Sequence, residues 1–224
     1  MPPRPKYTKE EIVQAAIEIV KKSGIDAVVA REVAKELGTT TGPIFTYFDT
    51  MDELKEEVYL YAKEHCIKGL KESLKYTPAF KEFGLRWIRY AKKDPNLYML
   101  LFMMKGIRKN GEDFINLDFL EVLTPMVGEV MQEFYVSQAD AKRMICRMLI
   151  FAQGIASMLI NEIADFSEEE LSCMLSEMCV SFAAGCKIQD GTIDLQHTKR
   201  MYDRLGAFPE IKRKEKKQEE KIEQ

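Results

Sequence analysis

The sequence predicts an all-α protein of about nine helices, and three observations support this fold class. Apolar residues recur at intervals of three and four along most of the 224 residues, which is the spacing of a helix face. No stretch of any length alternates apolar and polar residues as a strand does. With 46% hydrophobic residues and only 12 glycines and 8 prolines, the composition is that of a folded, largely helical chain.

The first predicted helix follows a short basic arm, residues 1–7, that is rich in proline. Thr8 and Glu11 have the Thr-x-x-Glu spacing of a capping box, in which each side chain accepts a backbone N–H from the other residue. Apolar residues then line one face, and Gly24 is expected to end the helix.

Two short helices and a tight turn are predicted next, over Arg31–Leu37 and Thr41–Phe48. Gly38 stands where a helix C-terminus favours a left-handed residue. One of the three threonines at 39–41 is expected to cap the second of these helices, and Pro43 is tolerated in its first turn. This arrangement predicts a helix-turn-helix.

Capping and punctuation signals divide the rest of the chain into six further helices. Their expected positions are 51 to about 74, after Thr77-Pro78 to about 93, 95–104, 113–135, 138–164 and 167–187. Thr50 and Glu53 have the spacing of a second capping box, and later helices are expected to begin at Ser137 and at Ser167, which has Glu170 at its N3 position. The expected domains are the arm (1–7), a helix-turn-helix domain (8–54, extending in its last helix to about 66), a ligand-binding and dimerisation domain (55–205) and a charged tail (206–224).

Charge and cysteine content restrict the function further. The net charge is −3, so any affinity for nucleic acid must come from a local surface. No apolar run reaches the roughly 20 residues of a membrane span, and the basic start leads directly into a charged helix, so we expect neither a signal peptide nor a membrane partner. The five cysteines contain no Cys-x-x-Cys pair. We expect reduced thiols in a cytoplasmic protein.

The segments Ala30–Gly38 and Thr40–Phe48, followed by Asp52-Glu53-Leu54, resemble the DNA-binding domain of the TetR family (TetR/AcrR-like) of one-component transcription regulators. The sequence departs from the family pattern at three places. Val29 stands where a capping Thr or Ser is usual, Phe45 where Tyr is usual, and Met51 where Lys is frequent.

This resemblance implies a ligand-responsive transcriptional regulator, most simply a repressor, that binds a pseudo-palindromic double-stranded operator as a homodimer and is released by a small hydrophobic effector. The recognition helix would present its N-terminal residues to the major groove. The resemblance implies that Tyr47 contacts a phosphate, while the basic arm suits an adjacent groove. The expected DNA-binding residues are Arg4, Lys6, Arg31, Thr39, Thr40, Thr41, Gly42, Pro43, Phe45, Thr46 and Tyr47.

Small residues occupy one side of the last two predicted helices. They would allow two copies of this helix pair to form a four-helix bundle across a two-fold axis. The alternative is that they pack within the same chain. The residues concerned are Ala152, Gly154, Ala156, Ser157, Ala183 and Ala184.

Large, adaptable apolar residues are concentrated in the middle of the chain, which has 13 methionines in all. We hypothesise that they enclose an apolar ligand pocket, the alternative being an ordinary Met-rich core. The residues concerned are Trp87, Tyr90, Phe102, Met103, Met104, Phe119, Met126, Met148 and Phe151.

Two other function classes compete with DNA binding. An all-helical enzyme is disfavoured because the two histidines, His65 and His197, lie far apart and no metal-ligand spacing or nucleophile motif is present. We therefore expect no catalytic residue, metal or cofactor. A thiol-based redox regulator, responding through Cys66 or Cys186, remains an alternative.

Overall fold

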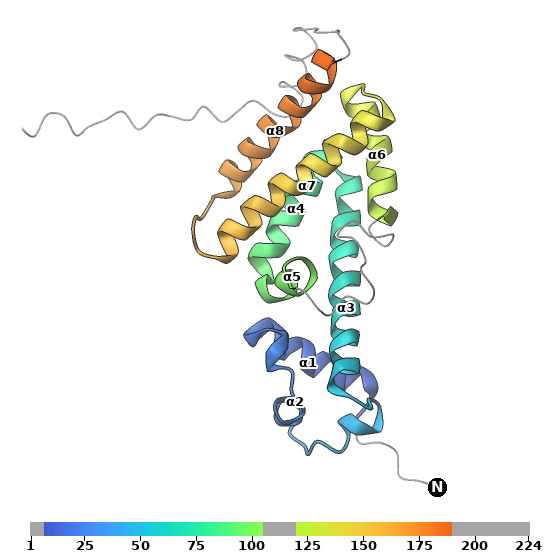
Figure 1. Ribbon diagram of the computed structural model, residues 1–224, viewed down its shortest axis with the longest axis vertical. Helices are drawn as coiled ribbons and strands as arrows, with labels where there is room; N and C mark the ends of the chain where they lie inside the picture. The colour runs from blue at the N-terminus through green and yellow to red at the C-terminus, as the bar shows by residue number, and fades with distance from the viewer. Residues whose placement is uncertain (1–6, 105–119, 190–224) are drawn as a thin grey trace, which may run out of the picture.

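The computed structural model describes residues 7–104 and 120–189, and within them it is all-α (Figure 1). These two ranges contain eight α-helices and three short 3-10 helices. Their bounds are α1 Lys9–Ser23, η1 Ile25–Ala27, α2 Ala30–Glu36, η2 Ile44–Thr46, α3 Met51–Lys71, η3 Glu72–Lys75, α4 Ala79–Lys93, α5 Pro95–Phe102, α6 Leu120–Phe134, α7 Gln138–Ile160 and α8 Glu168–Gln189.

The predicted start of α1 is confirmed. Thr8 accepts the backbone N–H of Glu11, and the Glu11 carboxylate accepts the N–H of Thr8 at 2.8 Å, so the capping box is complete. Gly24 follows the helix with φ of 80°, a conformation that few other residues adopt without strain.

The end of α2 is also as predicted. Gly38 has φ of 66°, and its N–H donates to the carbonyl of Lys35 while that of Thr39 donates to Ala34. These two bonds form a Schellman motif, which satisfies the last carbonyls of the helix.

The predicted third helix, Thr41–Phe48, is wrong in length and type. Only Ile44–Thr46 is helical, as a single 3-10 turn, and no threonine side chain caps it. Pro43 has no N–H to donate, so the hydrogen bonds of the turn begin at Ile44, which donates to the carbonyl of Thr41. The segment is therefore a compact turn rather than a two-turn helix.

The long helix α3 joins the N-terminal and C-terminal parts of the structure (Figure 1). At its start Thr50 accepts the N–H of Glu53, as predicted, but the Glu53 carboxylate accepts the N–H of Asp49 rather than that of Thr50. Along its length α3 contacts α1, α4, α5 and α6. It is thus placed to transmit a displacement from one part to the other.

Helix α4 forms the centre of the C-terminal part and contacts α5, α6, α7 and α8. Gly84 lies fully buried on α4, where an added Cβ would be 3.0 Å from Met148 Sδ on α7 and 3.1 Å from Leu175 Cδ2 on α8. The absence of a side chain at this position therefore allows the three helices to approach closely.

The ends of the remaining helices differ slightly from the prediction. Helix α5 stops at Phe102, α7 stops at Ile160, and α8 begins after Ser167, which forms the predicted reciprocal bonds with Glu170. Ser137 caps α7 by accepting the N–H of Asp140. The predicted residues 113–119 and the charged tail lie outside the described residues.

Helix α7 is, by length and composition alone, apolar enough to cross a membrane, although no uninterrupted apolar run within it reaches the length of a span. It nevertheless packs against α4, α6 and α8, and its first half carries three basic residues at 142, 143 and 147. Packing in a helical core accounts for its apolar character.

Candidate nucleic-acid interface

The turn between α2 and α3 presents a polar, threonine-rich surface on a buried apolar base. Ile44 is fully buried and Phe48 is 3% exposed, so these two side chains fix the turn to the core of the N-terminal domain. In contrast, Phe45 is 49% exposed. The other exposed residues of the turn are Thr40, Thr41, Gly42 and Thr46, while Thr39 and Pro43 are half-buried.

A relay of two tyrosines ties this turn to the start of α1. The Tyr47 hydroxyl donates to the backbone carbonyl of Tyr7 at 3.0 Å, and the Tyr7 hydroxyl donates to the carbonyl of Leu37 at 2.9 Å. The relay therefore fixes the point where the basic arm joins α1 against the helix-turn-helix. Arg4 and Lys6 themselves lie outside the described residues.

The prediction of Tyr47 as a phosphate contact did not include its bond to Tyr7. The Tyr47 hydroxyl has one proton, which it donates to the carbonyl of Tyr7. It can therefore donate to a bound phosphate only if that hydrogen bond is exchanged. Tyr7 was missed by sequence reasoning, because no local pattern connects residues 7, 37 and 47.

Several polar side chains on this face already form local hydrogen bonds or ion pairs. The Thr46 hydroxyl donates to the carbonyl of Gly42 at 3.3 Å. Lys22 pairs with Glu36 at 2.9 Å. Arg31, by comparison, is exposed and forms no ion pair with any described residue, so its guanidinium is available to a phosphate.

The N-terminus of α2 lacks the cap that the helices α1, α3 and α7 have. Val29 has the extended backbone of an N-cap residue, with φ of −122° and ψ of 153°, but its side chain accepts no hydrogen bond. The departure noted in the sequence is therefore a real loss of a cap.

Helices α1 and α2 and the start of α3, with an exposed turn between α2 and α3 that Ile44 and Phe48 anchor, have the arrangement of a helix-turn-helix domain. Residues 12–58 match the family model of bacterial regulatory proteins, tetR family. The match extends from α1 through the turn into α3. The N-terminal domain is thus a TetR-type DNA-binding domain.

The predicted ligand-binding aromatic residues lie close together in the C-terminal part. The ring centroids of Trp87 and Phe102 are 4.4 Å apart, and Tyr98, which the prediction omitted, lies 4.8 Å from Phe102 and 6.0 Å from Tyr90. Trp87 Nε1 donates to the Tyr98 hydroxyl at 2.6 Å, which in turn donates to Gln153. This aromatic cluster links α4, α5 and α7.

Burial raises the pKa of both Tyr90 and Tyr98 well above the ordinary tyrosine value. Unlike Tyr98, the Tyr90 hydroxyl has no hydrogen-bond partner among the described residues. A buried hydroxyl without a partner is costly, so a ligand that bonded to Tyr90 would gain from supplying one.

The other predicted ligand residues are distributed differently. Met126 and Met148 are fully buried in the core, and Phe151 is half-buried. Met103, 39% exposed, follows the end of α5. Phe119 lies outside the described residues.

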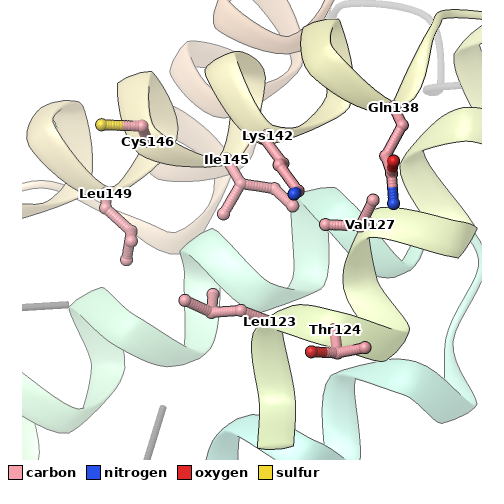
Figure 2. Close-up of a pocket in the computed structure, with 8 residues that line it drawn as sticks. All are labelled: Leu123, Thr124, Val127, Gln138, Lys142, Ile145, Cys146 and Leu149. Carbon is pink, nitrogen blue, oxygen red and sulfur yellow. The ribbon is translucent and has the colours of Figure 1, made fainter. Parts of the chain in front are cut away.

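A cavity of about 410 Å³ opens between α6 and α7 (Figure 2). None of the predicted ligand residues that the structure describes lines it, because the prediction selected the largest apolar side chains rather than the gap between two helices. Its lining residues are Leu123, Thr124, Val127, Gln138, Lys142, Ile145, Cys146 and Leu149.

The predicted dimer residues require a correction. Ala152, Ala156 and Ala183 are fully buried within this single chain, so their methyl groups pack inside it and cannot contact a second copy. Gly154 is exposed, and Ser157 and Ala184 are half-buried. Small residues occur on both the inward and the outward faces of these helices. Composition alone therefore could not distinguish the residues buried within the chain from those exposed to a second copy.

The thiols proposed for redox sensing are not accessible. Cys66 is 3% exposed and Cys186 is 1% exposed, and burial raises the pKa of both thiols. Such thiols are poor nucleophiles. Cys146 is the exposed cysteine among the five. Within the described residues, no group of three His, Cys, Asp or Glu side chains is arranged to hold a metal ion.

Proposed function

We propose that this protein is a homodimeric transcriptional repressor that binds a pseudo-palindromic operator and is released by a small hydrophobic effector in the cytoplasm. The observation that carries the proposal is the exposed threonine-rich turn within the segment that matches the tetR family. The hydroxyl and methyl groups of Thr40, Thr41 and Thr46 suit contacts to phosphates, base edges and thymine methyls.

An outward face of α7 supports the dimer. Ile150 is 68% exposed and Met158 is 41% exposed, and Gly154 lies between them at the same four-residue spacing. Beside them α8 runs along α7 (Figure 1) and contributes the half-buried Phe182. An exposed apolar stripe of this kind suits burial against its own copy.

The packing between α5 and α1 supports transmission from the C-terminal part to the DNA-binding domain. Asn96 on α5 donates through its side-chain amide to the carbonyl of Lys21, in the last turn of α1, at 2.9 Å. The same helix carries Tyr98 and Phe102 of the aromatic cluster. An effector bound at Tyr90 would act only if it preferred one position of α5 over another.

Sedimentation and DNA binding together test the proposal. The chain should sediment as a dimer at micromolar concentration and bind its own promoter DNA, and Ile150→Asp should produce a monomer with much weaker operator affinity. Met131→Asp is the matched control, because Met131 is a methionine of α6 that is 36% exposed and is not part of the Ile150–Met158 stripe. A wild-type monomer that binds the operator at full affinity would overturn the dimer.

The same experiment addresses the threonine contacts. Replacing Thr40 and Thr41 by valine keeps their shape but removes the hydroxyl groups from an exposed turn, so the fold should be retained while operator affinity falls. Unchanged affinity in this double variant would refute the role assigned to these residues.

A further inference from the structure

The cavity between α6 and α7 has an apolar floor and a polar rim. Leu123, Ile145 and Leu149 are each less than 9% exposed, and they form the floor with the half-buried Val127. Thr124, Gln138, Lys142 and Cys146 are exposed at the rim. At about 410 Å³, the volume is within the range of small-molecule sites, roughly 300–1,000 Å³.

The polar residues of α7 are concentrated at one end of the cavity. Gln138 and Lys142 are one helical turn apart, and Figure 2 shows both side chains pointing from α7 toward α6, next to Val127. Ile145 and Leu149 continue the same face of α7. On the α7 side, the cavity thus has Gln138 and Lys142 at one end and Ile145 and Leu149 toward the other.

Among the described residues, the charge at this cavity is positive and uncompensated. None of the eight described residues that line it is acidic, and Lys142 forms no ion pair with a described residue. Its neighbour Arg143, by contrast, is paired with Asp140. Lys142 is therefore the cation that remains available to an anion at the rim.

From these observations we infer that the α6–α7 cavity binds a small amphipathic anion, such as a medium-chain carboxylate. The carboxylate pairs with Lys142 and accepts a hydrogen bond from Gln138, while the hydrocarbon part covers Leu123, Val127, Ile145 and Leu149. This site is separate from the aromatic cluster of α4, α5 and α7, because no residue of that cluster lines it. It therefore does not depend on the proposed effector site.

Cys146 provides a direct reporter of occupancy. Its thiol is exposed and its residue lines the cavity, whereas Cys66, Cys179 and Cys186 are buried. Cys173 on α8 is half-buried and does not line the cavity. It serves as an internal control on the same molecule.

The test measures the rate of alkylation of each cysteine by iodoacetamide, followed by peptide mass spectrometry, in the full chain without DNA. Decanoate should slow alkylation of Cys146 at least threefold while leaving Cys173 unchanged. Decanol and decylammonium, which have the same tail without the negative charge, should protect less. Acetate, which has the charge without the tail, should not protect.

Substitution of the cation completes the test. Lys142→Gln should weaken decanoate binding about two- to fivefold, as expected for an exposed ion pair, and Lys93→Gln, at an exposed lysine of α4 outside the cavity, should leave it unchanged. The inference is overturned if decanoate does not protect Cys146, if it protects Cys173 equally, or if decylammonium protects as well as decanoate.

Discussion

Restoring the missing cap of α2 is predicted to stabilise the protein. The change is Val29→Thr, which exchanges one methyl group for a hydroxyl at a side chain that is 45% exposed. The backbone at Val29, with φ of −122° and ψ of 153°, is already that of an N-cap residue. The new hydroxyl can therefore accept the N–H of Glu32 without any movement of the chain.

The gain is that of an N-cap alone. The backbone N–H of Val29 already donates to the carbonyl of Ala27 at 2.9 Å, so it is not free for the Glu32 carboxylate as a full capping box requires. An N-cap contributes about 0.5–2 kcal/mol, typically about 1. For a chain of this size about 1 kcal/mol raises the midpoint of thermal unfolding by roughly 2–4 °C.

Urea unfolding followed by circular dichroism at about 222 nm, where helix content dominates the signal, measures this gain. Val29→Ala is the control for loss of the valine methyl groups without a hydroxyl, and it should not stabilise. A Val29→Thr protein no more stable than Val29→Ala would refute the assignment of Val29 as the N-cap.

Three further predictions concern other contacts. Tyr47→Phe removes the hydroxyl that donates to the carbonyl of Tyr7. The free energy of unfolding should therefore fall by about 1 kcal/mol, and operator affinity should fall as well. An unchanged stability in urea would contradict the relay. Gly84→Val places methyl groups where a Cβ alone would be 3.0 Å from Met148 Sδ and should cost about 1–3 kcal/mol; a thermal midpoint equal to wild type would contradict the close approach of α4 and α7. The Arg89 guanidinium, which contacts Glu168 at 2.7 Å, lowers the pKa of that carboxylate below the ordinary value of 4.5. The contribution of this ion pair to stability is therefore complete above pH 4.5 and is lost as pH falls through the lower folded-state pKa of Glu168. Glu168→Gln should therefore flatten the decline of stability in acid. An acid profile identical to that of the wild type would count against the pair.

Local signals in the sequence predicted the helices well because their causes are local. Thr8, Ser137 and Ser167 cap the helices they were expected to cap, and Gly38 has the left-handed conformation that its position demanded. These features depend on residues within about one turn of each other. The recognition segment was less predictable: only Ile44–Thr46 forms a helical turn, and no threonine side chain caps it.

Features that depend on how helices pair could not be predicted in the same way. The spacing of Ala152 and Ala156 shows that both lie on one face of α7 but not which neighbour covers that face, and the structure places this chain's own helices there. The cavity beside Lys142 and Cys146 results from the separation of α6 and α7, which no residue pattern encodes. The Tyr7–Leu37 bond was missed for the same reason.

The central claim, that the turn between α2 and α3 binds DNA, is tested most directly by the salt dependence of binding to the chain's own promoter DNA. Fluorescence anisotropy should show an affinity that falls linearly in a log–log plot against salt concentration. Arg31→Gln, at an exposed residue without a described acidic partner, should reduce the slope by about 0.9 for each subunit that contacts the operator. No binding at low salt, or binding whose affinity does not change with salt, would contradict the account.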